Sequence, residues 1–108
     1  WIRDEDKIYL IAEDGGILGF VLAFIDNEVS REASISDLYV VPEKRGEGTA
    51  RKLVDSVLRA LKENGMRRVT LAVHTRNSVA LTMYESVGFT VADDHYQLME
   101  LDLGTIDL

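Results

Sequence analysis

A short glycine-containing turn carries the residues of this sequence that are best suited to bind an anion. Residues 45–50 read Arg, Gly, Glu, Gly, Thr and Ala, and they separate a β-rich run from a stretch with helical periodicity. The first N–H groups of a helix have no partner within it, and the helix dipole favours negative charge at that end. Gly46 and Gly48 also let another group approach the backbone closely. We therefore expect this turn to bind a phosphate.

Basic side chains surround the turn although the chain as a whole is acidic. Lys44, Arg45, Arg51 and Lys52 are four of 12 Lys and Arg residues, whereas 19 Asp and Glu residues give a formal net charge of −7. Neither common phosphate-binding motif is present, because G-x-x-x-x-G-K-[ST] is absent and G-x-G-x-x-G lacks its third glycine. Taken alone, such a turn is as readily structural as functional.

A second motif lies one helix and one strand further along the chain. Its pattern is N-x-x-A-x-x-x-Y-E-x-x-G-F, spelled by Asn77, Ala80, Tyr84, Glu85, Gly88 and Phe89. Together with the pattern V-x-P-x-x-R-G-x-G-x-A at residues 40–50, it makes the sequence resemble the GNAT superfamily of acetyl-CoA-dependent N-acetyltransferases. The resemblance covers nearly the whole chain. The family has a further strand and one or two helices before the position of Trp1, so we expect an N-terminal segment to be missing.

The resemblance implies an acetyl-CoA site. The backbone of Leu38, Tyr39 and Val40 would bind the pantetheine where their strand splays from the next one, and an N–H near Tyr39 or Val40 would polarise the thioester carbonyl. Asn77 would hydrogen-bond to the pantetheine arm. The turn and the first helical residues would bind the pyrophosphate. The residues assigned to the cofactor there are Arg45, Gly46, Glu47, Gly48, Thr49, Ala50 and Arg51.

By the same resemblance, Tyr84 is the general acid. An amine that attacks a thioester must be neutral, and the reaction needs an oxyanion donor and a proton for the departing thiolate. A thiolate with a pKa of about 8 to 9 is well matched by a phenol with a pKa of about 10. A lone tyrosine at helical spacing is more often a core aromatic, and the surrounding motif favours the catalytic interpretation of Tyr84.

Asp37 is the candidate base, because it directly precedes Leu38 on the strand that would carry the thioester. A carboxylate that orients the amine, or one that lies on the strand surface, is the alternative. Ser36 stands where polyamine-type and thialysine-type members often have Glu, and Ala72 stands where members that acetylate protein N-termini have Glu or His. With no cysteine, we expect direct attack in a ternary complex rather than a covalent acetyl-enzyme.

Composition excludes several other classes of protein. The chain has 108 residues, of which 46% are hydrophobic and 29% charged, as in one globular domain over residues 1–108. The acidic balance disfavours a nucleic-acid surface, and no apolar run is long enough to cross a bilayer. The absence of cysteine suits a reducing cytoplasm and excludes a thiolate metal site. We expect a cytoplasmic enzyme that binds neither nucleic acid, membrane nor metal, and the resemblance also allows a homodimer through the last strands.

The elements that position these residues form an α/β (α+β) pattern. We predict strands at residues 7–13, 17–26 and 33–41, and the first two are joined by the tight turn Asp14-Gly15-Gly16. An apolar stripe predicts a helix from Thr49 to a stop at Asn64-Gly65, and a strand at 68–74 completes a parallel crossover. A second helix runs from its cap at Asn77 to Gly88, and antiparallel strands follow at 89–92 and 96–103. The expected fold is a mixed central sheet of the GNAT type.

Two other functions remain open at this point. The absence of an obvious base and of the N-terminal region fits a non-catalytic acyl-CoA-binding regulatory module. A purely structural α/β interaction domain is the second alternative. The leading prediction is an N-acetyltransferase that moves the acetyl group of acetyl-CoA to a primary amine of a small molecule or peptide.

Overall fold

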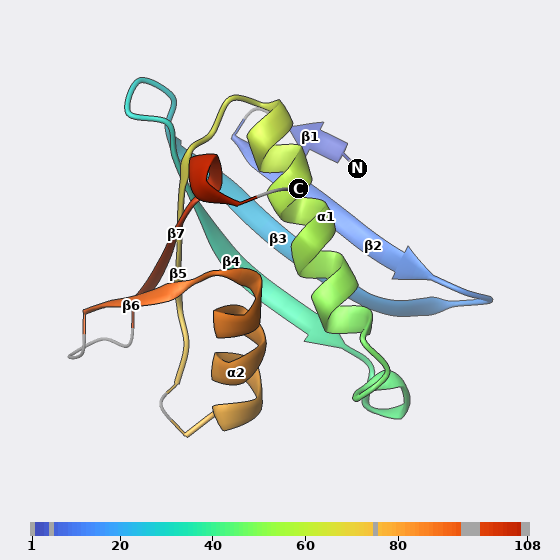
Figure 1. The fold of residues 1–108 in the computed structure, drawn as a ribbon. Coiled ribbons are helices and arrows are strands. Elements are labelled where there is room, and N and C mark those ends of the chain that lie inside the picture. The colour runs from blue at the N-terminus through green and yellow to red at the C-terminus, as the bar shows by residue number, and fades with distance from the viewer. Residues whose placement is uncertain (1, 5, 75, 94–97, 107–108) are drawn as a thin grey trace.

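The computed structural model describes residues 2–4, 6–74, 76–93 and 98–106 of the chain. These residues form a seven-stranded sheet in the order β1-β2-β3-β4-β5-β7-β6, with two α-helices (Figure 1). The strands are β1 (Ile2–Asp4), β2 (Lys7–Glu13), β3 (Ile17–Asn27), β4 (Glu32–Val40), β5 (Arg68–Ala72), β6 (Thr90–Asp93) and β7 (Leu98–Asp102). The helices are α1 (Thr49–Glu63) and α2 (Ser78–Val87), and short 3-10 helices are η1 (Pro42–Lys44) and η2 (Leu103–Thr105). The predicted mixed sheet is confirmed.

The N-terminal half of the sheet is antiparallel, as predicted. β2 pairs with β3, and β3 pairs with β4. In the turn between β2 and β3, the Asp14 N–H donates to the Gly16 carbonyl at 3.0 Å, and Gly15 has φ +72°. The edge strand β1 was not predicted. It has three residues of which only Ile2 is apolar, so its strand character comes from pairing with β2 rather than from a local pattern.

Helix α1 connects two parallel strands and covers β2, β3 and β4 (Figure 1). Its predicted apolar stripe is buried, and each large side chain on it stabilises the fold by about 1.5–3 kcal/mol. The buried residues of the helix are Leu53, Val54, Val57, Leu58, Ala60 and Leu61. The helix ends at its C-cap Asn64, and Gly65 follows with φ +84°, as the predicted Asn-Gly stop requires.

The C-terminal strand pair is confirmed, and its place in the sheet is new information. β7 pairs with β6 and also lies next to β5, so the last strand inserts between two earlier ones.

The prediction that this strand extends to Leu103 is wrong. It ends at Asp102, whose carboxylate accepts hydrogen bonds from the Gly104 N–H at 2.8 Å and from Arg67 Nε at 3.2 Å. These two bonds hold the pKa of Asp102 below its usual value and start η2. Of the residues between the two predicted strands, Asp93 belongs to β6, and residues 94 and 95 lie outside the described residues.

Gly19 lies where β3 and β4 approach each other closely. A Cβ built there would lie 2.3 Å from the Tyr39 carbonyl oxygen and 3.1 Å from the Val40 Cα. Both of these atoms are backbone, so the two strands would have to separate to admit a side chain. Any residue other than glycine at this position would therefore disturb the end of β4.

We predict that Gly19→Ala lowers the free energy of unfolding by about 1–3 kcal/mol, because overpacking against backbone atoms cannot be relieved by a rotamer change. Gly16→Ala is the matched control, since a Cβ there meets nothing within 4 Å, and we expect a change within roughly 0.5 kcal/mol. Urea denaturation of both variants measures the difference. Equal losses in the two variants would contradict the close contact.

Candidate functional site

The site begins where β4 and β5 stop pairing. The ladder between them consists of Glu32↔Arg68, Ala33↔Val69 and Ser34↔Thr70. Beyond Ser34, β4 continues to Val40 and stays paired with β3, and its edge toward β5 has no strand partner among the described residues. The backbone groups on this open edge need hydrogen-bond partners from solvent or a ligand. The predicted splay of the two strands is thus present (Figure 1).

A β-bulge lies at the start of the open edge. Asp37 is opposite Leu22 and Ile35 is opposite Ala23, which leaves Ser36 as the extra residue. Ser36 and Asp37 are both exposed, and the Ser36 hydroxyl donates to Asp37 Oδ2 at 3.1 Å. A bulge bends its strand and redirects the side chains next to it. The bulge therefore turns Asp37 outward beside the open edge.

The turn after β4 presents the N-terminus of α1. Gly46 and Gly48 have φ +82° and +84°, and a Cβ at either would meet nothing within 4 Å. Gly48 is the N-cap of α1, and among the residues that the structure describes no side chain caps this end of the helix. The Lys52 N–H donates to the Gly48 carbonyl and starts the helical pattern, so the N–H groups of residues 49–51 precede the first helical bond. This turn combines open space with uncapped donors, as anion binding requires.

Arg45 ties the turn to the end of β4. Its Nε donates to the Val40 carbonyl at 2.9 Å, and its guanidinium lies 5.6 Å from the centre of the Tyr39 ring. Tyr39 continues a row of aromatic rings, with centroid distances of 5.9 Å to Phe20 and 5.8 Å from Phe20 to Tyr9. The Arg45 side chain therefore fixes the turn against the strand in addition to adding positive charge.

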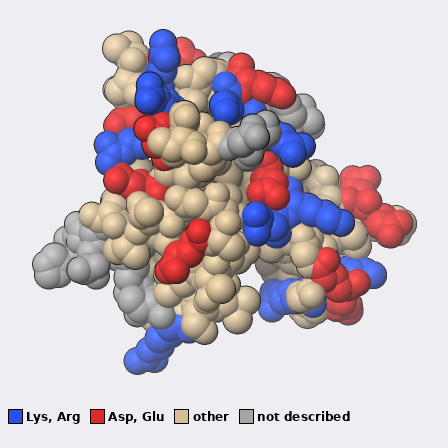
Figure 2. Space-filling model, in the orientation of Figure 1, with Lys and Arg blue, Asp and Glu red and all other residues tan. Residues whose placement is uncertain are grey.

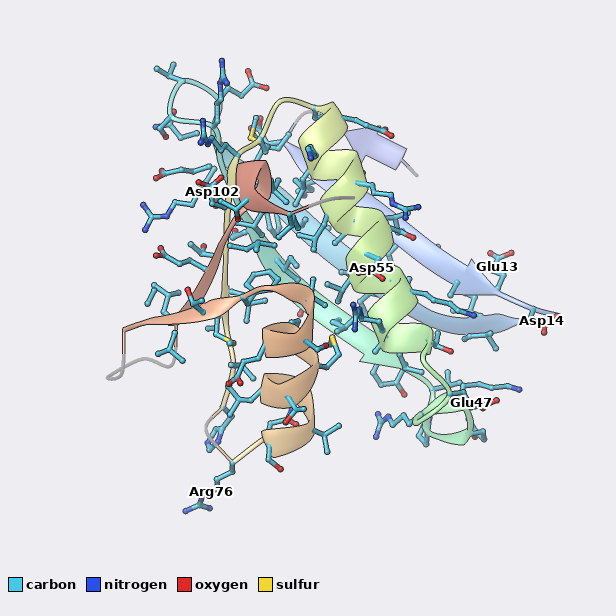
Figure 3. The ribbon with its side chains drawn as sticks, viewed as in Figure 1. Glu13, Asp14, Glu47, Asp55, Arg76 and Asp102 are labelled. Carbon is cyan, nitrogen blue, oxygen red and sulfur yellow. The ribbon has the colours of Figure 1, made fainter. Side chains whose placement is uncertain are left out.

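Charge around the turn is mixed rather than uniformly basic. Figure 2 shows acidic and basic side chains intermingled over the face that carries the helices. Glu47 lies within the turn and Asp55 further along α1 (Figure 3). Arg51, at the start of α1, forms an ion pair with Asp55 at 3.4 Å and donates from Nη1 to the Ser86 hydroxyl of α2 at 2.9 Å. This contact between the helices was not predicted, because nothing in the local pattern around Ser86 indicates it.

Tyr84 lies on α2, which follows β5. Its side chain is 7% exposed, and its ring packs edge-on against Phe89 at 5.6 Å. Burial raises the pKa of Tyr84 above its ordinary value. The described residues contain no buried side-chain oxygen without a hydrogen-bond partner, and none of them forms a hydrogen bond with the Tyr84 hydroxyl. The hydroxyl oxygen therefore keeps some contact with solvent although the ring is buried.

Asn77 caps α2 as predicted, because its Oδ1 accepts a hydrogen bond from the Ala80 N–H at 3.1 Å. Arg76, just before it, points away from both helices (Figure 3). His74 Nδ1 accepts a hydrogen bond from the Arg76 N–H, which gives it a local structural role. His95 lies outside the described residues.

The predicted site residues lie on two segments: one runs from β4 through the turn into the first turn of α1, and the other is α2 with its cap Asn77. Residues 37–40 and 45–51 are continuous through η1, and α2 follows the strand that diverges from β4 (Figure 1). Among the described residues, no hydrogen bond or ion pair joins Asp37 to Tyr84. The described part of the chain contains no group of three or more metal-binding side chains. No described helix is both long and apolar enough to cross a membrane.

A cavity of about 510 Å³ lies elsewhere, at the amino end of β5. Its lining includes Arg67, Arg68, Glu100 and Asp102. The arginines are already paired with carboxylates, Arg67 with Asp102 and Arg68 with Glu100, and hydrogen bonding to Glu100 raises the pKa of Arg68. This cavity is remote from the turn at the carboxyl end of β4, and we do not assign the site to it.

Sequence comparisons identify relatives of the chain. The profile of the acetyltransferase (GNAT) family matches residues 1–89. An uncharacterized N-acetyltransferase of Methanocaldococcus jannaschii is 34% identical over 91 residues, which cover 81% of this chain and 40% of the relative. The mycothiol acetyltransferase of Corynebacterium efficiens is 34% identical over 99 residues, which cover 88% of this chain and 31% of the relative. The chain thus spans less than half the length of these relatives.

Solved structures of N-acetyltransferases share the fold of this chain. The PaiA N-acetyltransferase from Thermoplasma acidophilum, in complex with coenzyme A, has a TM-score of 0.79 at 27% identity, over 90% of this chain and 61% of that one. The ribosomal-protein-S18-alanine N-acetyltransferase from Escherichia coli has a TM-score of 0.81 at 21% identity, over 97% of this chain and 74% of that one. From the family match over residues 1–89 and these likenesses, we conclude that the chain belongs to the acetyltransferase (GNAT) family.

Proposed function

We propose that this chain carries the cofactor half of an acetyl-CoA-dependent N-acetyltransferase, which moves an acetyl group to a primary amine of a small molecule or peptide. The observation that carries the proposal is the open edge of β4 next to the uncapped N-terminus of α1. An extended ligand with amide groups at one end and a pyrophosphate at the other matches these two features in chemistry and in order. Family membership supports the same cosubstrate.

The residues present fit acetyl-CoA. Leu38, Tyr39 and Val40 would bind the pantetheine amides with the backbone groups that β5 leaves unpaired, much as an added strand pairs with a sheet edge. The turn at Gly46 and Gly48 would hold the pyrophosphate, because side chains there would fill the space that the anion needs. The Asn77 amide nitrogen would contact the pantetheine arm while Oδ1 caps α2.

The chemistry needs a proton donor and a carboxylate near the acceptor. When bound, acetyl-CoA supplies the thioester, whose C–S bond breaks as the amine nitrogen forms its bond to the acetyl carbon. Tyr84 gives its proton to the leaving sulfur; a phenol is already protonated at neutral pH, and burial raises the pKa of Tyr84 further. Asp37, exposed at the bulge, faces the acceptor and attracts or deprotonates the amine. A backbone N–H near Tyr39 or Val40 polarises the thioester carbonyl.

The names of relatives and the charge of the chain bear on the acceptor of the enzyme. Relatives of the chain are named for mycothiol, and the excess of acidic residues suits a cationic acceptor. A cytoplasmic location and a homodimer through the last strands are part of the same proposal. No nucleic-acid partner is expected from a net charge of −7.

The first test compares two glycines with equal backbone strain. Gly48→Ala and Gly65→Ala each place a side chain at φ +84°, so each should cost about 1–2 kcal/mol of stability. Gly48→Ala also puts a methyl group where the pyrophosphate would lie. We therefore expect Gly48→Ala to bind acetyl-CoA at least about 10-fold more weakly than Gly65→Ala does, which corresponds to about 1.4 kcal/mol of binding free energy. Isothermal titration calorimetry measures both affinities. Equal affinities in the two variants would reject the phosphate site.

The second test removes the proposed acid. We expect Tyr84→Phe to lower kcat by about 100-fold or more, since general acid catalysis contributes about 10²–10⁴. Affinity for acetyl-CoA should stay within about twofold, because the ring packing against Phe89 is retained. Free thiol release with a panel of amines provides the assay, and Tyr9→Phe on β2 is the control. Unchanged turnover with chemistry rate-limiting would exclude Tyr84 as the acid.

A pH titration checks the burial of Tyr84 without turnover. Its pKa is raised in the folded state, so its contribution to stability is present below the unfolded pKa of about 10 and is lost as pH rises through the folded value. The Tyr84→Phe variant should therefore lose less stability than wild type above about pH 10.

The same binding and thiol-release assays test the two alternative functions. Binding of acetyl-CoA without thiol release from any amine would indicate the non-catalytic module, and absence of binding would indicate the interaction domain.

A further inference from the structure

A chain of hydrogen bonds joins α1 to α2. Arg51 Nη1 donates to the Ser86 hydroxyl at 2.9 Å, and that hydroxyl donates its own proton to the Met83 carbonyl at 2.6 Å. Asp55 Oδ1 accepts from Arg51 Nε at 3.4 Å and so orients the guanidinium from one turn along α1. The single hydroxyl proton of Ser86 is used once, and its oxygen accepts once, so the directions of the bonds are consistent.

The Arg51–Ser86 bond links two helices whose preceding strands are not paired at this end of the sheet. Helix α1 follows β4 and helix α2 follows β5, and these strands diverge after Ser34 and Thr70. The sheet ladder therefore does not fix the distance between the two helices at this end. Within the described parts of the chain, the Arg51–Ser86 bond is the only side-chain hydrogen bond between α1 and α2. It starts in the first turn of α1, two residues after Thr49.

The link meets α2 at the turn that carries Tyr84. Met83 and Ser86 stand on either side of Tyr84 in the sequence, and both belong to the hydrogen-bonded chain. The C-terminal end of α2 is held separately, because the N–H groups of Gly88 and Phe89 donate to the Tyr84 carbonyl. The Arg51–Ser86 bond adds a contact toward α1 that these backbone bonds do not provide.

We infer that Arg51 and Ser86 are positioning residues, which set the Tyr84 hydroxyl relative to the anion site at the N-terminus of α1. The inference rests on the proposed function of Tyr84. It also changes the role of Arg51, whose guanidinium holds α2 in place in addition to any contact with phosphate. Ser86 then contributes to catalysis although it touches neither cofactor nor reacting atoms.

Exposure separates this role from simple stabilisation. The side chains of Arg51 and Asp55 are 45% and 38% exposed, and ion pairs of this kind contribute little to global stability. A displacement of about 1 Å at a catalytic group, in contrast, can reduce the rate by up to about 100-fold. Loss of the link should therefore appear in kcat rather than in the melting temperature.

The test uses Ser86→Ala, with Ser56→Ala on the exposed face of α1 as the matched control. We expect Ser86→Ala to lower kcat about 3- to 10-fold while KM for acetyl-CoA stays within about twofold. Ser86→Thr keeps the hydroxyl and should restore kcat, whereas Ser56→Ala should match wild type. A fall in kcat that Ser86→Thr does not rescue would overturn the inference.

A double-mutant cycle and amide exchange complete the test. If Arg51 acts through Ser86, adding Ser86→Ala to an Arg51→Lys variant should change kcat no further. Amide exchange in α2 should accelerate in Ser86→Ala, with β2 and β3 unchanged. This readout needs no turnover, so it decides whether the link holds α2 even if wild type transfers no acetyl group and the proposed function fails. Unchanged exchange, or faster exchange with wild-type kcat, would overturn the positioning role.

Discussion

The end of pairing between β4 and β5 is the constraint on which the rest of the site depends. Three ladder positions hold the strands together, from Glu32↔Arg68 to Ser34↔Thr70, and then the edge of β4 is open. An unpaired strand edge is normally a liability, because its N–H and C=O groups invite association with another chain. Here the open groups lie beside a helix N-terminus whose first donors are also free of side-chain caps. Both features become useful when one extended ligand satisfies them together.

The remainder of the fold keeps β4 in place despite its open edge. β3 pairs with β4 along its length, and the missing side chain at Gly19 allows their backbones to approach closely near Tyr39. Helix α1 packs a continuous apolar stripe against β2, β3 and β4. The Arg45 side chain then donates a hydrogen bond to the Val40 carbonyl, which ties the turn to the end of the strand.

Features set by local chemistry could be predicted from the sequence. The stripe on α1, the Gly15 hairpin, the Gly65 stop and the Asn77 cap each depend on residues a few positions apart. The turn at residues 45–50 and the strand before it were also recognisable, because glycine spacing and the second motif point to the same site. The splay of β4 from β5 was expected only through the family resemblance and is present in the structure.

Features set by distant contacts could not be predicted. β1 is defined by its pairing with β2, and the position of β7 between β5 and β6, unlike the strand itself, depends on distant pairing. The last strand ends at Asp102 because Arg67 and the Gly104 N–H bind that carboxylate. The side chain of Arg51 reaches Ser86, 35 positions away, and no local pattern encodes that distance. Burial of Tyr84 likewise results from tertiary packing, although its helical position was evident.

NMR mapping of backbone amide shifts during titration with acetyl-CoA would locate the cofactor site residue by residue. We expect the largest changes at residues 38–40 on the open edge of β4 and at residues 46–51 in the turn and the first turn of α1. Changes confined to the cavity around Arg67 and Arg68, with the edge of β4 unaffected, would contradict this expectation.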